Sequence, residues 1–537
     1  MEGRIFSLLD EPWILATSIE GESLVLSLTE VFGKAHKIKA LSGEMPAQDV
    51  AIIRLLLGVL YAVVTRSDEY RQARESVDNE LPLKIWKEIW EKKCFSSKEI
   101  YTYLHKYQNR FYLIHPERPF YQVAKLGKGT DYKAYKLIGD IAQGERSTVS
   151  NGKRLFKYRS DRSIQSIGYA EAARWLIYIN AFDDASGKPT VRGGKYPAVG
   201  PGWLGKLGVV YATGGSLFET LMLNLSLLDR NKNLWEDGQA TWELSIPRTD
   251  ERSEIPLPNN PISLLTMQSR RISLTLDKSG ISGFRALGGD FFQEENSFTE
   301  LMTTWRLDKS DESKYKPKRH DASKQLWRDF TTLFSEAEDT VLRPGIIEWL
   351  TTLGYHGAIS SGYVQIRAVS VNYASAQRSA VKDSWEDTIS FNASLLSAIG
   401  EDWVQCIPKI LKTTEQLVNT LGFLAADIAM ALGDIDGVVK SQSTKEEAYF
   451  RLNMPFRDWL AAIDPSVDSI DEARKSWLAT VEGIIRDLGN ELISQAGART
   501  FVGREVGQDK KELYTAPKAY KKFQGKIRYM LKEGLSV

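Results

Sequence analysis

Hydrophobic and polar residues alternate with a period of two in several short stretches of the chain, which predicts strands. In the stretch 363–387, Val364 and Ile366 alternate with polar residues, and Val381 and Trp385 do so again after a gap of small polar residues. We therefore expect a β-hairpin at 363–387 whose long exposed tip carries Asn372, Tyr373, Ser375, Gln377 and Arg378. An ordinary solvated turn has the same composition, so the pattern alone assigns the tip no function.

The first 388 residues mix such strands with short helices. Two β-like runs at 13–16 and 24–27 flank a turn at 20–23, and apolar runs predict further strands at 255–265, 271–276 and 284–287. Apolar residues at helical spacing predict helices at 46–66, 84–90, 168–181 and 209–230.

From residue 389 onward the apolar spacing is helical. Apolar residues recur every three to four positions from Phe391 to Leu432, and amphipathic segments follow at 444–463, 468–497 and 515–534. Four antiparallel helices with short links form a bundle. Because 537 residues exceed what one core accommodates, we predict an α+β fold with two domains. A large mixed N-terminal domain covers 1–388, and an all-α four-helix bundle covers 389–537.

Composition indicates an ordinary globular protein, with 42% hydrophobic and 26% charged residues. Cys94 and Cys406 are too far apart for a disulfide framework or a metal knuckle, and the five histidines lack metal-ligand spacing, so we expect no cofactor and no metal. The N-terminus has no signal-peptide pattern, and the apolar run 55–64 is too short to cross a bilayer. We expect a cytoplasmic protein with no membrane contact.

Charge is balanced overall but uneven along the chain. The 70 basic and 69 acidic residues give a formal charge of +1. However, residues 125–162 hold 10 basic and 4 acidic side chains, and residues 504–537 hold 9 and 4. Clusters of this size can follow a nucleic-acid backbone, although most are simply solvated.

One segment matches a phosphate-binding pattern. Gly200 to Lys206 fits GxxxxGK, the loop that cradles nucleotide phosphates. Leu207 stands where a Ser or Thr would bind magnesium, and no buried β-strand run precedes Gly200. A nucleotide-dependent enzyme is therefore an alternative that the pattern disfavours.

Six short motifs occur in order along nearly the whole chain. They are LLDEPWI at 8–14, His115 with Pro119-Phe120-x-Gln122, LFKY at 155–158, LFETLMLN at 217–224, QSRRISL at 268–274 and Tyr373-x-x-x-Gln377. Together they resemble the large subunit of the type I-E CRISPR Cascade surveillance complex, the CasA family.

The resemblance implies a non-catalytic subunit that works with a guide RNA and the other Cascade subunits. Such a subunit reads the PAM of a double-stranded DNA target through the minor groove, wedges the duplex open to start R-loop formation and helps recruit the helicase-nuclease. The resemblance assigns the groove contact to Gly193 and Gly194. It assigns the wedge to Gln377, next to Arg378. The basic loop contributes an aromatic position and phosphate contacts, here Phe156, Lys153, Arg154, Lys157 and Arg159, and with the bundle it forms an electrostatic cradle.

Two positions depart from the family pattern. Where relatives place a lysine toward the groove, this chain has Gly288, and Arg285 is the nearest cation. The cysteine pairs of some relatives are also absent. Phe156 either contacts DNA or anchors its loop to the core. Besides the nucleotide-dependent enzyme, a purely architectural subunit that reads no DNA remains an alternative.

Overall fold

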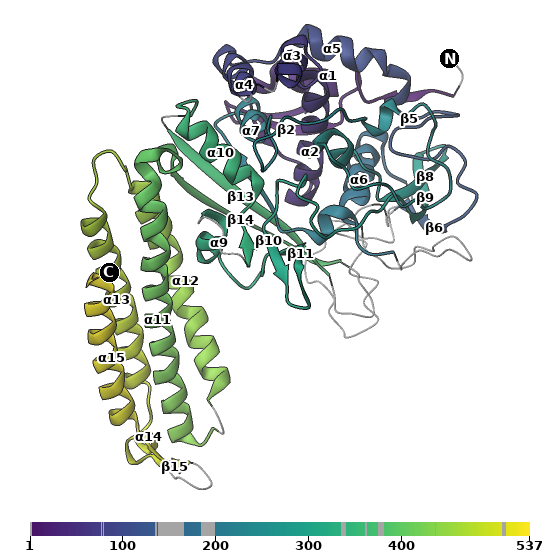
Figure 1. Cartoon of the computed structure of the whole chain (residues 1–537). Helices are drawn as coiled ribbons and strands as arrows, with labels where there is room; N and C mark the ends of the chain where they lie inside the picture. The colour runs from purple at the N-terminus through teal and green to yellow at the C-terminus, as the bar shows by residue number, and fades with distance from the viewer. Residues whose placement is uncertain are drawn as a thin grey trace. The chain divides into compact units, whose positions relative to one another are not determined.

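The structure is a computed structural model that describes residues 3–76, 78, 80–134, 137, 166–183, 199–334, 340–359, 362–373, 381–434, 437–506 and 512–536. The chain forms two compact units. The first comprises Met1–Ala322, Ala337–Leu350 and Gln365–Thr388, and the second comprises Ser323–Glu336, Thr351–Val364 and Ile389–Val537. The fold is α+β, as predicted, and its C-terminal region consists mainly of long helices (Figure 1). The prediction of an all-α C-terminal domain misses one short hairpin, formed by β15 (Arg504–Val506) and β16 (Glu512–Tyr514).

The first unit is built around one apolar helix, α2 (Pro46–Val64), which packs against α6 (Tyr169–Phe182) and α8 (Pro261–Leu265). By length and composition alone α2 could cross a membrane, but 89% of its apolar window is buried inside the protein, as in a core helix. Further helices of this unit are α1 (Leu28–Lys34), α3 (Asp68–Ser76), α4 (Leu81–Lys92), α5 (Ser97–Lys106) and α7 (Leu217–Leu223). Helix α10 (Gly345–Tyr355) begins in the first unit and ends in the second.

The described strands of the first unit form five small sheets. Their orders are β1-β5, β3-β2-β4, β6-β9-β8, β14-β13-β7 and β11-β10-β12. The bounds are β1 (Ile5–Ser7), β2 (Ile14–Ser18), β3 (Ser23–Leu26), β4 (Ile38–Leu41), β5 (Tyr112–Ile114), β6 (Thr130–Lys133), β7 (Val209–Thr213), β8 (Arg270–Asp277), β9 (Gly280–Gly288), β10 (Trp305–Asp308), β11 (Asp311–Pro317), β12 (Val341–Leu342), β13 (Tyr363–Tyr373) and β14 (Val381–Asn392). The predicted strands of the 363–387 hairpin are thus confirmed as the neighbours β13 and β14.

Three predicted elements are wrong. The expected helix 209–230 is strand β7 followed by α7, because β-branched and aromatic residues at 209–211 pair with β13 and two glycines at 214–215 end the strand. No strand forms at 255–265. The last five of these residues are helix α8, which Pro261 begins and Asn260 caps by accepting from the Ser263 amide. The helix expected from Phe391 starts only at Glu401, because β14 continues to Asn392.

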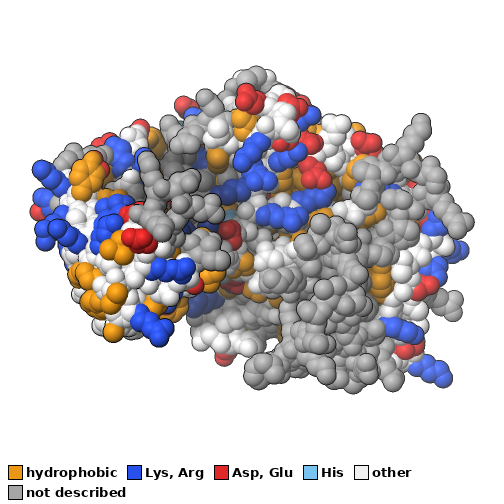
Figure 2. All heavy atoms as spheres, turned by 90° about the horizontal axis from the view of Figure 1, so that it is seen from below, with side chains coloured by type: hydrophobic (Ala, Val, Ile, Leu, Met, Phe, Trp, Pro, Cys, Tyr) orange, Lys and Arg blue, Asp and Glu red, His pale blue; other side chains and the backbone are white. Residues whose placement is uncertain are grey.

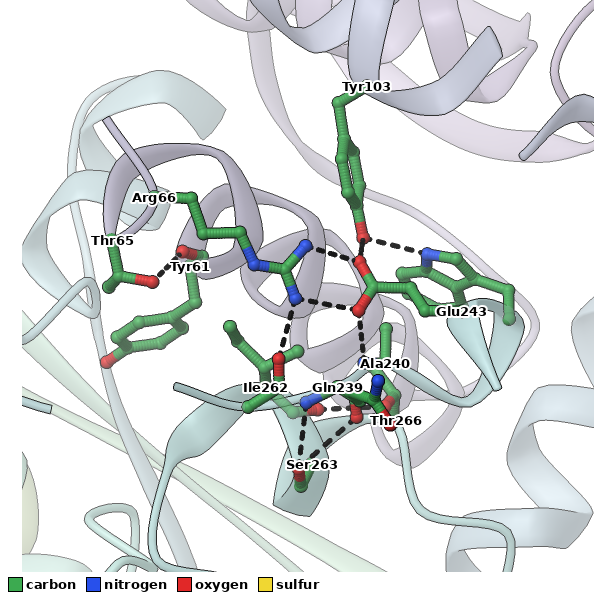
Figure 3. A network of polar contacts seen from close by, with 12 residues as sticks. Tyr61, Thr65, Arg66, Tyr103, Gln239, Ala240, Glu243, Ile262, Ser263 and Thr266 are labelled. Atoms are coloured by element: carbon green, nitrogen blue, oxygen red, sulfur yellow. Dashed lines mark hydrogen bonds and ion pairs between the residues drawn. The ribbon is translucent and has the colours of Figure 1, made fainter. Parts of the chain in front are cut away.

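A buried polar network ties α2 and α5 to the segment 238–266 (Figure 3). The Glu243 carboxylate accepts two hydrogen bonds from the Arg66 guanidinium, at 2.6 and 2.7 Å, and one from the Tyr103 hydroxyl at 2.6 Å. The Ala240 amide supplies a fourth donor at 3.0 Å, and the Trp242 indole donates to the Tyr103 hydroxyl at 2.9 Å. Every oxygen of the carboxylate is therefore bonded, which offsets the cost of burying its charge.

The second unit contains the predicted four-helix bundle. Its helices are α11 (Glu401–Leu432), α12 (Val438–Ala462), α13 (Ile470–Ser494) and α15 (Ala516–Ser536). Between α13 and α15 lie α14 (Ala498–Val502) and the hairpin of β15 (Arg504–Val506) and β16 (Glu512–Tyr514). Helix α9 (Phe330–Phe334) follows Trp327, whose ring stacks on Phe456 of the bundle with centroids 4.7 Å apart.

Candidate nucleic-acid interface

At the base of the predicted hairpin, strand β13 has a neighbouring strand on each side. Strand β13 pairs with β7 on one side and neighbours β14 on the other, where Arg367 forms an ion pair with Glu386. Tyr373 ends β13, and its hydroxyl donates to the Phe182 carbonyl at 2.6 Å. Burial raises the pKa of this hydroxyl well above its usual value, so it remains a donor at neutral pH. Asn372 and Tyr373 were predicted at the exposed tip, but both belong to strand β13. Tyr373 instead anchors the base of the hairpin, and the Arg319 guanidinium carbon lies 5.3 Å from the centroid of its ring.

The segment that contains Gly193 and Gly194 follows Phe182, the residue whose carbonyl Tyr373 bonds. Helix α6 ends at Phe182, and the segment's two flanks, Asp183 and Gly200, are joined by Arg270. The Arg270 guanidinium bonds the Asp183 carboxylate at 2.9 Å, the Asp183 carbonyl at 3.0 Å and the Gly200 carbonyl at 2.8 Å. The Gly202 amide also donates to the Asp183 carbonyl at 2.9 Å. We call these contacts the Arg270 clamp.

Close packing fixes the clamp and the hairpin base together. A Cβ on Gly205 would overlap the Tyr373 hydroxyl oxygen, and one on Gly202 would overlap the Ala181 carbonyl. Gly205 lies in the short 3-10 helix Trp203–Lys206, and Gly202 is the N-cap of that helix. The Trp203 indole donates to buried Glu300 at 2.7 Å. Glu300 in turn pairs with Arg54 of α2 at 2.8 Å. The bases of both predicted DNA-contacting segments are thus connected to the central helix.

The basic segment starts from a different place. Lys133 of β6 lies opposite Gly283 of β9, and Ile167 bridges to Ile281 of the same strand, so the described flanks of the basic segment meet at one edge of β9. Ile167 precedes α6, whereas the Arg270 clamp lies at the C-terminal end of that helix. The 14 residues of α6 separate the two points by about 21 Å at the rise of an α-helix.

Most predicted contact residues lie outside the described part of the chain. These are Gln377, Arg378, Gly193, Gly194, Phe156, Lys153, Arg154, Lys157 and Arg159. Arg285 is described on β9, where its guanidinium bonds the Asp131 carboxylate at 2.8 and 3.0 Å and the Leu126 carbonyl at 3.0 Å. This pairing lowers the pKa of the Asp131 carboxyl. A Cβ on Gly288 would lie 2.7 Å from Val199, so that position has no room for a long side chain.

The Gly200–Lys206 segment does not have the geometry of a phosphate loop. A phosphate loop connects a strand to a following helix, whereas this segment ends in a 3-10 helix that leads into β7. The Lys206 ammonium forms an ion pair with Glu294. The adjoining cavity, lined by Gly200, Lys206 and Arg270 among others, measures about 30 Å³, which is space for about one water. Among the described residues, no group of three or more His, Cys, Asp or Glu side chains could hold a metal ion.

The positioning residues escaped sequence reasoning. Arg270 and Tyr373 each belong to one of the family-like motifs, but their partners, Asp183, Gly200 and Phe182, lie 70 to 191 positions away in the chain. The only available signal was a pair of arginines opening an apolar strand, where a buried charge requires a partner.

Comparison with known proteins gives consistent matches over nearly the whole chain. Residues 7–488 match the family described as CRISPR-associated protein Cse1. The CRISPR-associated protein CasA/Cse1 of Thermus thermophilus is 26% identical over 440 residues, which is 80% of this chain and 78% of that protein. The crystal structure of Thermobifida fusca Cse1 is 27% identical, with a TM-score of 0.81 over 99% of this chain and 98% of that one.

Two further solved structures share the fold. Cse1 from Acidimicrobium ferrooxidans has a TM-score of 0.78 at 23% identity, covering 99% of this chain and 98% of that one. A chain from a CRISPR RNA-guided surveillance complex has a TM-score of 0.71 at 16% identity, covering 98% and 99%. The chain therefore belongs to the Cse1 family of CRISPR-associated proteins, the CasA family of Cascade large subunits that its sequence motifs indicated.

Proposed function

We propose that the chain reads the PAM of double-stranded DNA through the minor groove and wedges the duplex open to start R-loop formation. It would do so as the large subunit of a type I-E CRISPR RNA-guided surveillance complex. Family membership supports the assignment to such a complex. In RNA-guided recognition the protein reads only a short duplex motif, and base pairing with the guide reads the rest of the target.

One observation carries the proposal: the 2.6 Å hydrogen bond from the Tyr373 hydroxyl to the Phe182 carbonyl. It joins the base of the hairpin, for which Gln377 is the predicted wedge, to the residue that precedes the segment with Gly193 and Gly194. Glycine backbone fits the narrow minor groove, where the base-pair code is degenerate and several related motifs are accepted. A side chain starting from the same base is well placed to enter the adjoining base step.

The Arg270 clamp supports the same proposal energetically. Inserting a side chain between base steps costs a few kcal/mol in lost stacking. A segment that must first become ordered adds a further cost, which a fixed base reduces. Since Arg270 is buried and bonds both flanks of the glycine segment, part of the ordering cost is met on folding.

The basic segment supplies the electrostatic part. Its flanks lie about 21 Å from the Arg270 clamp along α6, well under one helical turn of DNA of about 34 Å. Lys153, Arg154, Lys157 and Arg159 would contact phosphates along that length, with Phe156 beside them. Arg285, already paired with Asp131, would be a lesser contact.

The proposal makes the chain a non-catalytic, cytoplasmic binding subunit that also helps recruit the helicase-nuclease. Reconstituted complex, with and without this chain, should be tested for R-loop formation on a randomised PAM library. We expect R-loops on a narrow set of PAMs with the chain and loss of that selectivity without it. Unchanged duplex binding without the chain would favour a purely architectural subunit, and ATP turnover abolished by Lys206→Ala would favour a nucleotide-dependent enzyme.

A further inference from the structure

The bundle carries an exposed aromatic and basic surface on α11 and α15. The two helices run antiparallel, since Thr420 meets Met530 at 3.4 Å and Asp427 meets Lys522 at 3.7 Å. On this side Phe423 of α11 is 55% exposed, and Tyr529 of α15 is 62% exposed. Isolated exposed apolar residues are common on protein surfaces, so the surroundings of these two rings decide their meaning.

A cation lies against the Phe423 ring, and further cations occur along α15. The Lys526 ammonium lies 4.8 Å from the centroid of the Phe423 ring, and Tyr529 follows on α15 after one helical turn. Six Lys and Arg residues and one carboxylate occur in α15, namely Lys518, Lys521, Lys522, Lys526, Arg528, Lys532 and Glu533. Figure 2, seen from below, shows Lys and Arg side chains interspersed with hydrophobic ones on the bundle, at its left. The surface therefore favours an anionic partner.

The carboxylates nearby are engaged. Glu512 bonds Lys518 at 3.1 Å, Asp427 pairs with Lys522, and Glu533 accepts the Tyr529 hydroxyl. Gly525, one turn before Tyr529, has nothing within 4 Å of an added Cβ. Glycine is unfavourable inside a helix, and packing does not explain this one. It leaves open space beside the Tyr529 ring.

We propose that this α15 surface, formed by Tyr529, Phe423 and the lysines around them, binds single-stranded nucleic acid. Successive bases would stack on the two rings, and the lysines would contact the phosphates, as in other sequence-tolerant single-strand sites. A duplex does not fit this chemistry, because its paired bases offer no free face to a ring. An R-loop displaces one strand, so a ligand of this class is present in the reaction proposed above, yet the α15 surface does not depend on PAM reading.

Helix α12 of the same bundle exposes a different mixture of side chains. On α12, Val439, Phe450 and Met454 are 83%, 71% and 60% exposed, and Glu446 and Glu447 lie among them. Charges on α12 are nearly balanced, with four basic and three acidic side chains, whereas α15 has six basic and one acidic. Among the described residues of α15, Tyr529 is the only large hydrophobic side chain that is exposed. The excess of positive charge around an exposed ring is what favours nucleic acid over a protein partner on α15.

The test measures binding of the purified full chain to an oligothymidylate strand, an abasic strand of equal length and a duplex. Tyr529→Ala and Phe423→Ala should each weaken oligothymidylate binding about fivefold or more, the change expected when one stacked base is lost. Binding to the abasic strand should change little. Tyr529→Phe should keep the affinity, because it keeps the ring, and Phe450→Ala on α12 is the matched control.

Other basic segments of the chain also attract nucleic acid, so the decisive quantity is the preference for the base-bearing strand over the abasic one. Loss of that preference in the double variant, with an unchanged thermal unfolding curve, supports the proposal. An unchanged preference overturns it. So does a double variant that loses only its binding to other subunits of the complex. Neither result bears on PAM selectivity, which the library experiment measures separately.

Discussion

Arg66 and Arg270 both join chain segments that are distant in sequence, but they do so in different places. Arg66 bonds Glu243 within a network that also includes Tyr103 and ties helices to a packed loop (Figure 3). Arg270 bonds Asp183 and Gly200, the two flanks of a single segment. The same guanidinium chemistry therefore stabilises the core in one case and fixes the base of a proposed binding segment in the other. Variants should separate these roles.

The largest loss of stability is expected in the buried network of Glu243, Arg66 and Tyr103. Glu243→Ala removes a buried carboxylate whose side chain is 4% exposed and leaves Arg66 without its partner, which should lower the free energy of unfolding by about 3–5 kcal/mol. Urea unfolding measures this. The matched control is Asp237→Ala, which removes the partner of Arg74 from an exposed pair in the same unit and should cost about 1 kcal/mol or less. Equal losses in the two variants would contradict the importance of burial.

Asp49 of α2 is a second buried carboxylate, and it accepts fewer hydrogen bonds than Glu243. Its carboxylate accepts one backbone hydrogen bond, from the Gly43 amide at 2.8 Å, whereas Glu243 accepts four. Burial raises the pKa of Asp49 to about 7 despite that amide. The folded state therefore binds a proton that the unfolded chain releases near pH 4, and stability falls as pH rises from about 4 to 7.

Asp49→Asn should remove that loss. We expect stabilisation that is small near pH 4 and reaches about 2–4 kcal/mol above pH 7, since each pKa unit corresponds to about 1.36 kcal/mol. Urea unfolding at several pH values, with Asp68→Asn on the surface of α3 as control, gives the profile. A gain that does not depend on pH would show that the Asp49 carboxyl is not the titrating group.

Tyr373→Phe tests the base of the hairpin, and we expect a smaller loss of stability there. Losing the bond to the Phe182 carbonyl should cost about 1 kcal/mol of stability. Tyr70→Phe loses a bond to the Leu227 carbonyl and also the bond that the hydroxyl accepts from the buried Trp235 amide, so it should cost more, about 2–4 kcal/mol. The two variants should differ in function. In the reconstituted complex, Tyr373→Phe should slow R-loop formation on paired targets, and Tyr70→Phe should not. If both behave alike, the hairpin base has no special role in strand opening.

The sequence predicts elements well where one local pattern dominates. The bundle, the hairpin strands and α2 follow directly from apolar periodicity. It fails at residues 209–213, where an apolar run is a strand because β13 lies beside it. It also fails at 261–265, where Pro261 and Asn260 start a helix within an expected strand.

Some of the candidate functional residues could be predicted from the sequence, and others could not. The resemblance supplied Gln377, Gly193, Gly194 and the basic segment by position alone. It could not supply the contact between Tyr373 and Phe182, or the role of Arg270, because each depends on residues brought together only by folding. Composition likewise could not foresee that Arg285 is paired with Asp131.

The most direct test of the central claim uses Gln377→Ala. If Gln377 lies at an exposed hairpin tip, as the sequence predicts, this substitution removes no core contact, and unfolding stability should change by about 0.5 kcal/mol or less. R-loop formation should be strongly impaired on a fully paired target, because the wedge must offset an unstacking cost of a few kcal/mol. On a target whose PAM-proximal protospacer is already melted as a bubble, the defect should largely disappear. An equal defect on both targets, or none on either, would contradict the assignment of Gln377 as the wedge.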